Sequence, residues 1–543
     1  MCGIYAQFGS FTLNDALMCL KKLEYRGYDS YGIGYDNNNI YKDIGRIRLF
    51  EEKENKRVRK AICHTRWATN GCVSKENAHP QKSRDGNVVL VHNGILENEK
   101  IIRDTYFKDH EFNSQTDSEV IAELINLFLR TNEPFEAVRK VMDVIKGSYA
   151  IIFMIKNDSN IYFMKNKSSL IIAYDKEGYY LSSDIYALNK STIAYKHIND
   201  MSYGRIGPDY YYCDNDFIPY DFDFNTCSDS VMLDEIYQEE ELALNLYKNH
   251  HFCDNLINIV KESKDFVLIG SGSSFYAAEY IAKMIELKLE KRAKAFLPTE
   301  FEYNDLYAQS TYIFISQSGE TADVLNIIEN IKTNKKILLT NNPSSQMALH
   351  VPNVIDIKAQ REVAVASTKS FNQSVLAFYL LLMKVNNEEA DEIYAYIKNL
   401  EEIKKVFNHK KIETISKMKC VFYLGQGFDY IISKEGALKL KEIAYIPTEG
   451  YSTSELKHGS LALISCDTMV IGLSSKESFL TSSLNEVKAR GGNVLFLNTK
   501  YPSKLLGALA LVRYVQLIAY YVAVELKLDP EHPRNLAKSV TVI

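Results

Sequence analysis

The strongest constraint on the fold is a rhythm that occurs twice in the second half of the sequence. Short apolar runs end in small polar residues, and each is followed by a helical stretch. These runs lie at 265–274, 312–321, 335–345, 419–430, 467–478 and 492–502. Such a rhythm is typical of parallel sheets whose ligand loops follow the carboxyl ends of the strands. The sequence therefore predicts two α/β units, and the similarity of FVLIGSGSS to VFYLGQGFD indicates an internal duplication.

The amino-terminal part follows a different pattern, in which short β-branched and aromatic runs alternate with turn residues. Helical periods interrupt it at 13–23 and 118–129, with Ser118 as a candidate cap. Strands and helices in separate blocks predict an α+β layered domain. A chain of 543 residues is also too long for one core. The predicted parts are an α+β domain at 2–214, a linker at 215–234, α/β domains at 235–395 and 405–530, and a tail at 531–543.

Composition excludes several classes of protein. A formal net charge of -5 argues against nucleic-acid binding, which requires a basic excess. A hydrophobic content of 46% excludes disorder as the main state. Nine cysteines without a CxxC pair predict neither a disulfide framework nor a zinc site. We expect a cytoplasmic protein without a metal or an organic cofactor, because no secretory pattern and no cluster with metal-ligand spacing is found.

The segment 505–526 is long and apolar enough to cross a membrane. Arg513 and Gln516 stand near its middle, where a bilayer penalises an arginine by about 3 kcal/mol. The sequence therefore predicts a helix buried between protein layers, and no membrane partner.

Cys2 directly follows the initiator methionine. Removal of Met1 would leave a thiol and a free α-amine on one residue, which is a nucleophile with its own base. For Cys2 taken alone, an arbitrary second residue is the simpler explanation. The HNG motif at 92–94 offers an Asn side chain and a Gly amide to a developing oxyanion, although such triplets also form hairpin turns. Arg66 and Asp117 offer the two charges that an amino-acid substrate needs, and either also fits a surface charge.

Six short motifs between Cys2 and Val120 occur in the order of one known family. They are CGIYAQFG, LEYRGYDSYGIG, HTRWATNG, NAHP, VHNGILEN and TDSEV. Together they resemble the class II (Ntn-type) glutamine amidotransferase domain. The resemblance implies an αββα sandwich that hydrolyses glutamine to glutamate and ammonia.

The same resemblance implies a role for each matching residue. Cys2 would be the nucleophile, and Asn93 and Gly94 would form the oxyanion hole. Residues implied to bind or surround glutamine are Arg26, Gly27, Arg66, Trp67, Thr69 and Asp117. Trp67, the only tryptophan, would cover the substrate and guard the ammonia passage. Asn70 and Gln81 depart from the family pattern and bear on closure of the glutamine loop.

Two loops of the second half are predicted to hold a phosphate. SGSS at 271–274 and SQSGET at 316–321 each follow an apolar run and precede a helical stretch. Hydroxyls and amides at a helix N-terminus favour anions, although each loop alone is also an ordinary capped turn. No nucleotide P-loop and no dinucleotide fingerprint is present.

Lys439 and Glu442 are three residues apart and would share one helical face, either as a solvated ion pair or in a site. Further ionisable side chains follow at Glu449, Glu455, Lys457 and His458. Such groups around a phosphate-bearing cleft suit proton transfer beside a carbonyl. Lys538 is either a surface charge or an amine that condenses with a sugar carbonyl in a desolvated site.

Seven more motifs are ISQSGETADVL, VASTKSF, EGALKLKEIAYI, ELKHGSLAL, EVKARGG, VQLIAY and PRNLAKSVTV. They resemble the tandem SIS (sugar isomerase) domains of the amidotransferase family that aminates fructose 6-phosphate to glucosamine 6-phosphate. With the first half, the resemblance covers nearly the whole chain. It implies L-glutamine and fructose 6-phosphate as substrates, internally channelled ammonia, and a homodimer that starts amino-sugar synthesis.

Residues implied to bind the sugar phosphate are Ser273, Ser274, Ser316, Gln317, Ser318, Thr321, Val365, Ser367 and Ala537. Lys538 would form a Schiff base at C2, and Glu442 would move a proton between C1 and C2 with Lys439 beside it. His458 would assist ring opening from a partner subunit. Departures from the family pattern stand at Ser271, Phe275, Tyr276, Gln360, Arg361 and Ser460, and none removes one of these groups.

Two alternatives remain open. Another Ntn amidotransferase, such as the phosphoribosyl type, should carry a phosphoribosyl-pyrophosphate loop with adjacent acidic residues, and the sequence has none. A sugar-phosphate sensor that kept the SIS loops without chemistry should lack Glu442, His458 or Lys538, and all three are present.

Overall fold

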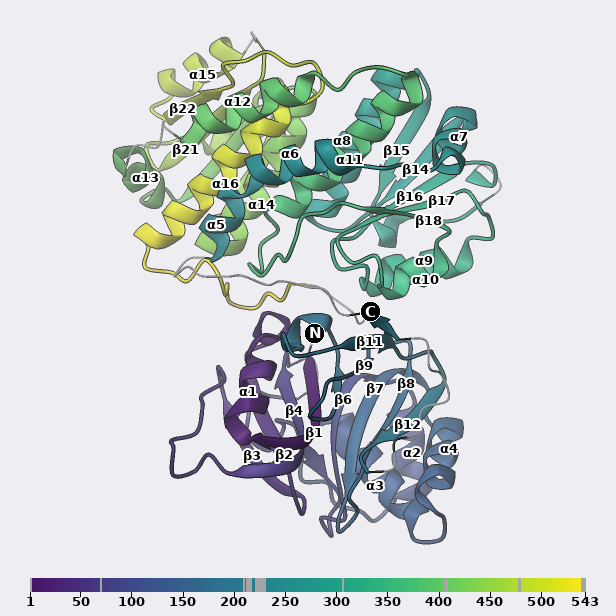
Figure 1. The fold of residues 1–543 in the computed structure, drawn as a ribbon. Helices are drawn as coiled ribbons and strands as arrows, with labels where there is room; N and C mark the ends of the chain where they lie inside the picture. The colour runs from purple at the N-terminus through teal and green to yellow at the C-terminus, as the bar shows by residue number, and fades with distance from the viewer. Residues whose placement is uncertain are drawn as a thin grey trace. The chain divides into compact units, whose positions relative to one another are not determined.

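A computed structural model describes residues 2–68, 71–208, 210, 217–219, 231–304, 307–404, 409–476 and 480–538. The chain forms two compact units, which divide between Asn225 and Thr226 inside the predicted linker (Figure 1). Helix α5 (Val231–Tyr237) begins before the predicted end of that linker. It forms there because Met232 and Ile236 are buried and because the Glu531 carboxylate accepts the Met232 amide at 3.0 Å.

The first unit contains two antiparallel sheets. The larger sheet has the order β13-β11-β9-β10-β1-β4-β2-β3 and the smaller has β12-β8-β7-β6-β5. The larger sheet consists of β1 (Gly3–Thr12), β2 (Ser30–Tyr35), β3 (Asn39–Ile44), β4 (Arg57–Arg66), β9 (Ile171–Tyr174), β10 (Tyr179–Ser182), β11 (Ala194–His197) and β13 (Ile218–Pro219). The smaller consists of β5 (Gln81–Lys82), β6 (Val88–Leu96), β7 (Gly147–Ile155), β8 (Ile161–Asn166) and β12 (Ser202–Ile206).

The two sheets pack face to face, and helices cover the outer faces. The helices of this unit are α1 (Leu13–Lys21), α2 (Glu99–Tyr106), α3 (Asp117–Leu129) and α4 (Pro134–Val144), with short 3₁₀ turns at Glu24–Arg26 and Ile185–Ala187. Side chains alternate along β1, so Ile4 and Ala6 enter the core between the sheets while Tyr5 packs under α1. The predicted αββα sandwich is confirmed.

The prediction of Ser118 as a helix cap is wrong. Helix α3 begins one residue earlier, at Asp117, and Thr116 is its N-cap residue. The hydroxyl of Ser118 instead lies 2.7 Å from His79 Nε2 and 3.0 Å from His92 Nδ1, because both rings reach it from neighbouring segments. The acidic side chain of Asp117 in the first turn suits the positive end of the helix dipole.

The second unit contains two parallel sheets, as predicted. The first has the order β15-β14-β16-β17-β18 and the second has β20-β19-β21-β22. Their strands are β14 (Asp265–Ile269), β15 (Arg292–Phe296), β16 (Thr311–Ile315), β17 (Lys336–Thr340), β18 (Asn353–Asp356), β19 (Cys420–Gly425), β20 (Thr448–Ser452), β21 (Thr468–Ser474) and β22 (Asn493–Asn498).

After α5 the helices of this unit are α6 (Glu239–Asn249), α7 (Asp254–Glu262), α8 (Ser273–Leu289), α9 (Ala322–Asn330), α10 (Gln346–His350), α11 (Lys369–Asn386), α12 (Glu392–Lys404), α13 (His409–Ser416), α14 (Phe428–Ala444), α15 (Leu480–Ala489) and α16 (Gly507–Glu525). One face of each sheet is buried in a common core, while α9 and α10 cover the opposite face of the first sheet and α15 covers that of the second. Short 3₁₀ turns lie at Pro298–Glu300, Glu455–His458 and Ser460–Leu463.

The structure supports the internal duplication indicated by the sequence. Strand β14 leads into α8 as β19 leads into α14. In the first sheet β14 lies between β15 and β16, and in the second sheet β19 lies between β20 and β21 in the same way. Both helices begin after a glycine with positive φ, at 57° for Gly272 and 66° for Gly427. These turns require the left-handed region, which glycine adopts without strain.

Helix α16 is the one helix among the described residues that is long and apolar enough to cross a membrane, and 89% of its apolar window is buried inside the unit. The predicted burial between protein layers is therefore confirmed. Arg513 on this helix is fully buried, and its guanidinium donates to Glu240 Oε1 at 2.5 Å and to the Ile236 carbonyl at 2.9 Å. These partners compensate the buried charge.

Candidate active sites

The first site is built around Cys2, which directly precedes β1. Antiparallel pairing of β1 with β4 sets Gly3 opposite Thr65 and brings Cys2 beside the end of β4. The amide of Trp67 donates to Cys2 Sγ at 3.3 Å, and the side-chain amide of Asn93 donates to the Cys2 carbonyl at 2.9 Å. The thiol, the tryptophan and the Asn side chain therefore meet at one point.

Gly94 follows Asn93 on β6 and has a φ of 136°. A Cβ atom at this position would lie 1.9 Å from the carbonyl oxygen of Ser148 on β7. Only glycine fits this approach of two strands, which keeps the backbone of Gly94 next to the Asn93 side chain.

Arg66 and Asp117 are both buried near Cys2. Burial lowers the pKa of Arg66, while Cys2, Asp29 and Asp117 act in the opposite direction. Asp117 Oδ2 accepts the Leu96 amide at 2.9 Å. Burial alone would raise the pKa of Asp117, but His92 and the Leu96 amide outweigh it and hold the pKa below its ordinary value. The pocket therefore keeps a carboxylate and a guanidinium in the charge states that an amino acid requires.

Arg26 and Gly27 support this arrangement from behind. The buried Arg26 guanidinium contacts Asp184 Oδ2 at 2.6 Å. A Cβ on Gly27 would lie 2.6 Å from the Trp67 amide nitrogen, so the close approach of the two loops depends on glycine. The Gly27 carbonyl accepts the hydroxyl of Thr65.

The residues after Trp67 are described in part. Thr69 and Asn70 lie outside the described residues. Gln81, the other departure from the family pattern, is buried and donates its amide to the carbonyls of Glu76 and Ala78 at 2.9 and 3.0 Å. It therefore fixes the loop before β5.

The sequence reasoning missed three histidines that form a buried cluster behind Asp117. The rings of His64 and His79 lie 4.1 Å apart, and His64 Nε2 lies 3.1 Å from the His92 carbonyl. Burial lowers the pKa of His64 to about 3 and lowers that of His79 as well, so both rings are neutral. All three stand inside the quoted motifs, but their contacts require the packing of the two sheets against each other, because His64 lies on β4 in the larger sheet and His92 on β6 in the smaller.

The second site lies at the carboxyl edge of the β14–β18 sheet. Strands β14 and β16 are neighbours in the sheet. From β14 the chain continues outward to β15 on one side, and from β16 it continues outward to β17 and β18 on the other. The SGSS and SQSGET loops follow these two strands, so both lie at the topological switch point where α/β proteins bind ligands. Helix α8 begins at Ser273, within the SGSS segment, and α9 begins at Ala322, directly after SQSGET.

The SQSGET loop is held by its own side chains. Ser316 Oγ accepts the Gly319 amide at 3.1 Å and lies 3.1 Å from Thr321 Oγ1. Ser318 Oγ accepts the Glu320 amide at 3.2 Å. The neighbouring carbonyl of Gln317 accepts the Asn341 amide at 3.0 Å, which ties the loop to the end of β17.

Lys439 and Glu442 lie on one face of α14, as predicted, with a distance of 2.7 Å between Nζ and Oε2. The alternative of a solvated ion pair is wrong for Lys439, which is fully buried because α14 packs against α16. Its Nζ also lies 3.5 Å from Glu435 Oε1, which accepts the hydroxyl of Ser273 at 3.0 Å. Burial raises the pKa of Glu435 to about 7. The SGSS loop is thus joined to the ion cluster on α14.

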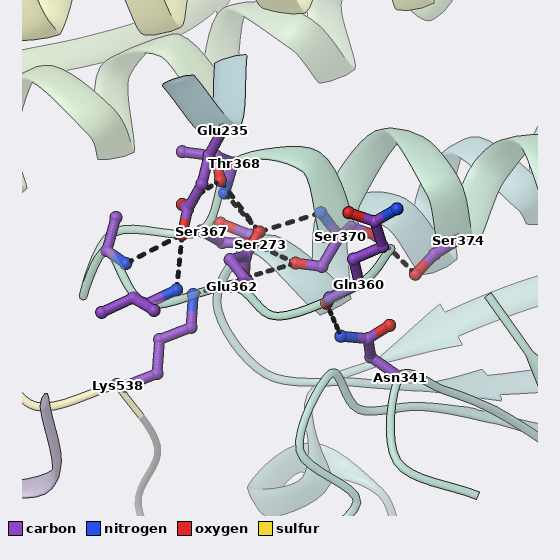
Figure 2. A network of polar contacts seen from close by, with 12 residues as sticks. Glu235, Ser273, Asn341, Gln360, Glu362, Ser367, Thr368, Ser370, Ser374 and Lys538 are labelled. Atoms are coloured by element: carbon purple, nitrogen blue, oxygen red, sulfur yellow. Dashed lines mark hydrogen bonds and ion pairs between the residues drawn. The ribbon is translucent and has the colours of Figure 1, made fainter. Parts of the chain in front are cut away.

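Lys538 is not a surface charge, since its side chain is 4% exposed and its Nζ binds Glu362 Oε2 (Figure 2). Contacts of Glu531 and Arg534 help to hold the tail that carries it. Glu531 caps α5, and the Arg534 amide donates to the Tyr445 hydroxyl at 2.7 Å. Ala537, next to Lys538, is half-buried.

Val365 and Ser367 lie in the loop that connects β18 to α11, beside Glu362. Val365 is buried and Ser367 Oγ lies 2.8 Å from Ser370 Oγ. Gln360, which departs from the family pattern, has a φ of 54° in the region that favours glycine. Asn341 stabilises it by donating to the Gln360 carbonyl at 2.5 Å (Figure 2).

The acidic and basic groups after Glu442 do not converge on the cleft within one chain. The hydroxyl of Tyr451 donates to Glu449, and Lys457 contacts Glu486 Oε1 at 2.6 Å. His458 is exposed at the end of its 3₁₀ turn. Among the residues that the structure describes, no group of three His, Cys, Asp or Glu side chains could hold a metal ion.

Comparison with known proteins assigns the family. Residues 64–190 match the glutamine amidotransferase domain, and residues 259–384 and 414–522 match the SIS domain. A glutamine–fructose-6-phosphate aminotransferase (isomerizing) from Listeria monocytogenes is 33% identical, with 100% of both chains covered. The chain belongs to this aminotransferase family. A relative of the same name from Staphylococcus epidermidis is also 33% identical over 100% of both chains.

Solved structures agree with this family in the second unit. The C-terminal domain of glucosamine-fructose-6-phosphate aminotransferase from Francisella tularensis is 26% identical, with a TM-score of 0.52 over 56% of this chain and 99% of that chain. A glucosamine-6-phosphate deaminase from Thermotoga maritima, 24% identical with a TM-score of 0.51 over 58% of this chain and 100% of that chain, shares the fold.

Proposed function

We propose that this member of the aminotransferase family moves the amide nitrogen of L-glutamine to fructose 6-phosphate and isomerises the product to glucosamine 6-phosphate, releasing glutamate. The observation that carries the assignment of residues is the pairing of two sites in one chain. In the first site, Cys2 lies against Trp67 and Asn93. In the second, the buried Lys538 contacts Glu362 within the unit that matches the SIS domain.

In the first site, the Cys2 thiol loses its proton to its own α-amine after removal of Met1 and attacks the glutamine amide carbon. Asn93 and Gly94 donate to the oxyanion, which is the largest stabilising contribution in such sites. Arg66 binds the substrate carboxylate and Asp117 its ammonium. The remaining contacts come from Arg26, Gly27, Trp67 and Thr69.

In the second site, the loops at 271–274 and 316–321 bind the sugar phosphate through hydroxyls and the amides of helix N-termini. Lys538 condenses with C2, and Glu442 carries the proton between C1 and C2 beside the fixed charge of Lys439. The exposed His458 serves ring opening in a partner subunit, which makes a homodimer part of the proposal. The proposed domains keep the bounds 2–214, 235–395 and 405–530, and the proposed compartment is the cytoplasm.

Isotope transfer tests this function. The protein is supplied with fructose 6-phosphate, amide-¹⁵N glutamine and an excess of unlabelled ammonium, and the sugar product is analysed by mass spectrometry. The proposal predicts glucosamine 6-phosphate that carries ¹⁵N, because ammonia passes internally from one site to the other. Unlabelled product would contradict internal transfer, and glutamate without amino sugar would contradict the acceptor.

A further inference from the structure

Two buried glutamates near Lys538 have no role in the function proposed above. Glu362 lies in the loop between β18 and α11, and Glu235 lies on α5. They are 2% and 3% exposed and stand on either side of Thr368 (Figure 2). Two buried carboxyl groups this close cannot both carry a charge without compensation.

The hydrogen bonds around Glu362 identify it as the ionised member. Its Oε1 accepts the amides of Thr368 and Ser370 at 3.0 and 2.9 Å. Its Oε2 accepts the Ser370 hydroxyl at 2.8 Å and the Lys538 ammonium. Both oxygens accept, which is the pattern of a carboxylate. Burial alone would raise the pKa of Glu362, but Lys538 and these donors hold it below its ordinary value.

The hydrogen bonds around Glu235 place a proton on it. Its Oε1 accepts the amides of Val363 and Ala364 at 2.5 and 3.2 Å. Its Oε2 lies 2.8 Å from Thr368 Oγ1, which in turn lies 3.0 Å from Glu362 Oε1. A hydroxyl has one hydrogen and cannot donate to two carboxylates. The chain of contacts is complete when Glu235 Oε2–H donates to Thr368 and Thr368 donates to Glu362. Burial and Glu362 raise the pKa of Glu235, in agreement with this count.

The same count of hydroxyl hydrogens applies to the loop that carries Ser367, which is proposed to line the sugar site. Because Ser370 gives its one hydrogen to Glu362, the hydroxyl of Ser367 must donate to Ser370 across their 2.8 Å contact. Glu362 is therefore the point at which Lys538, Ser367 and the protonated Glu235 are connected.

We infer that Glu362 is the base that accepts the proton which Lys538 loses on forming the Schiff base, and that Glu235 and Thr368 are positioning residues that donate a neutral hydrogen bond to it. The inference rests on the role of Lys538 in the proposed function. Glu362 takes one proton from the ammonium, and the free amine attacks C2 while the carbonyl electron pair moves to oxygen. That oxygen gains a proton from the nitrogen, and Glu362 returns its own proton to the resulting hydroxyl. Water leaves, and the C=N bond forms with the positive charge on nitrogen.

Borohydride trapping tests the inference. The full-length protein is mixed with fructose 6-phosphate without glutamine and reduced with borohydride, and the rate at which the sugar adduct forms is followed by intact mass. Glu362→Gln is expected to slow trapping by about 100-fold or more, as expected for loss of a proton-transfer group. Glu235→Gln reproduces a protonated glutamate, since its amide nitrogen donates to Thr368 and its oxygen accepts the two amides. It should lose only a few-fold. Glu389→Gln, at an exposed position, is the matched control.

Each outcome of these experiments supports or overturns a stated part of the inference. Trapping at the wild-type rate in Glu362→Gln would overturn the role of Glu362, and an equal loss in Glu235→Gln would overturn the proton placed on Glu235. If calorimetry shows that Glu362→Gln no longer binds fructose 6-phosphate, Glu362→Asp replaces it. That variant keeps the charge but is one methylene short, so at least a tenfold loss is expected and wild-type trapping contradicts the inference. Absence of an adduct in the wild type, or an adduct in Lys538→Ala, would instead refute the proposed function.

Discussion

Replacement of Asp117 by asparagine isolates the charge that is proposed to bind the substrate ammonium. Asparagine keeps an oxygen that can accept the Leu96 amide, now 2.9 Å from Asp117 Oδ2, so the start of α3 retains its main contact. What is lost is the negative charge, which His92 and the Leu96 amide maintain against burial in the wild type. The variant is therefore a charge deletion with little change of shape.

The expected magnitude follows from the type of contact. A hydrogen bond to a charged group contributes about 1.5–3 kcal/mol, which corresponds to roughly a 10- to 150-fold fall in kcat/KM for glutamine. The wild type should discriminate by the same factor against 4-carbamoylbutanoate, which is glutamine without its α-ammonium. Asp117→Asn should show almost no discrimination, because neither substrate then has a charged partner.

Ammonia release from the two substrates measures this directly, with Asp109→Asn as a control for the loss of one exposed charge from the same unit. Lys538 trapping by fructose 6-phosphate should be unchanged in both variants. Discrimination of the wild-type size in Asp117→Asn would refute the assignment of Asp117 to the ammonium.

Three further changes have defined outcomes. Gly94→Ala should lower glutaminase kcat by about 100-fold or more, because its Cβ would meet the Ser148 carbonyl and displace an oxyanion donor, and near-normal kcat would remove Gly94 from that role. Arg513→Met should lower the free energy of unfolding by about 3–5 kcal/mol in urea titration, since the buried Glu239 and the half-buried Glu240 lose their partner, and a change below 1 kcal/mol would contradict the ion-pair network. Glu435 has a folded pKa of about 7 against an ordinary value of 4.5, because burial favours its protonated form. Its contribution to stability is therefore present below about pH 4.5 and is lost as the pH rises through 7. Glu435→Gln should flatten the fall of the urea midpoint over this range, and an unchanged slope would refute the shift.

The regular parts of the fold could be predicted because their causes are local. Apolar runs that end in small polar residues predict parallel strands with loops at one edge, and the two loops lie at neighbouring strands β14 and β16. The burial of α16 followed from Arg513, which no bilayer would tolerate at that position without a partner. Cys2, Asn93 and Gly94 were found because short motifs carried them.

Other features depend on contacts between distant segments. Glu235 and Thr368 meet across 133 positions, and neither belongs to a periodic pattern. Ser118 fits a cap by residue type, but two histidine rings from other segments compete for its hydroxyl. Lys439 fits a solvated ion pair by spacing, and only the packing of α14 against α16 shows that it is buried. In each case the partner is set by sheet register or helix packing, which local sequence does not encode.

The most direct measurement is a product assay on the wild type, Cys2→Ala and Lys538→Ala, supplied with glutamine and fructose 6-phosphate, with glutamate and glucosamine 6-phosphate followed separately. We expect glutamate release to require Cys2 and formation of the amino sugar from glutamine to require both residues. Glutamate release that persists in Cys2→Ala, or amino sugar that persists in Lys538→Ala, would contradict the account of this enzyme.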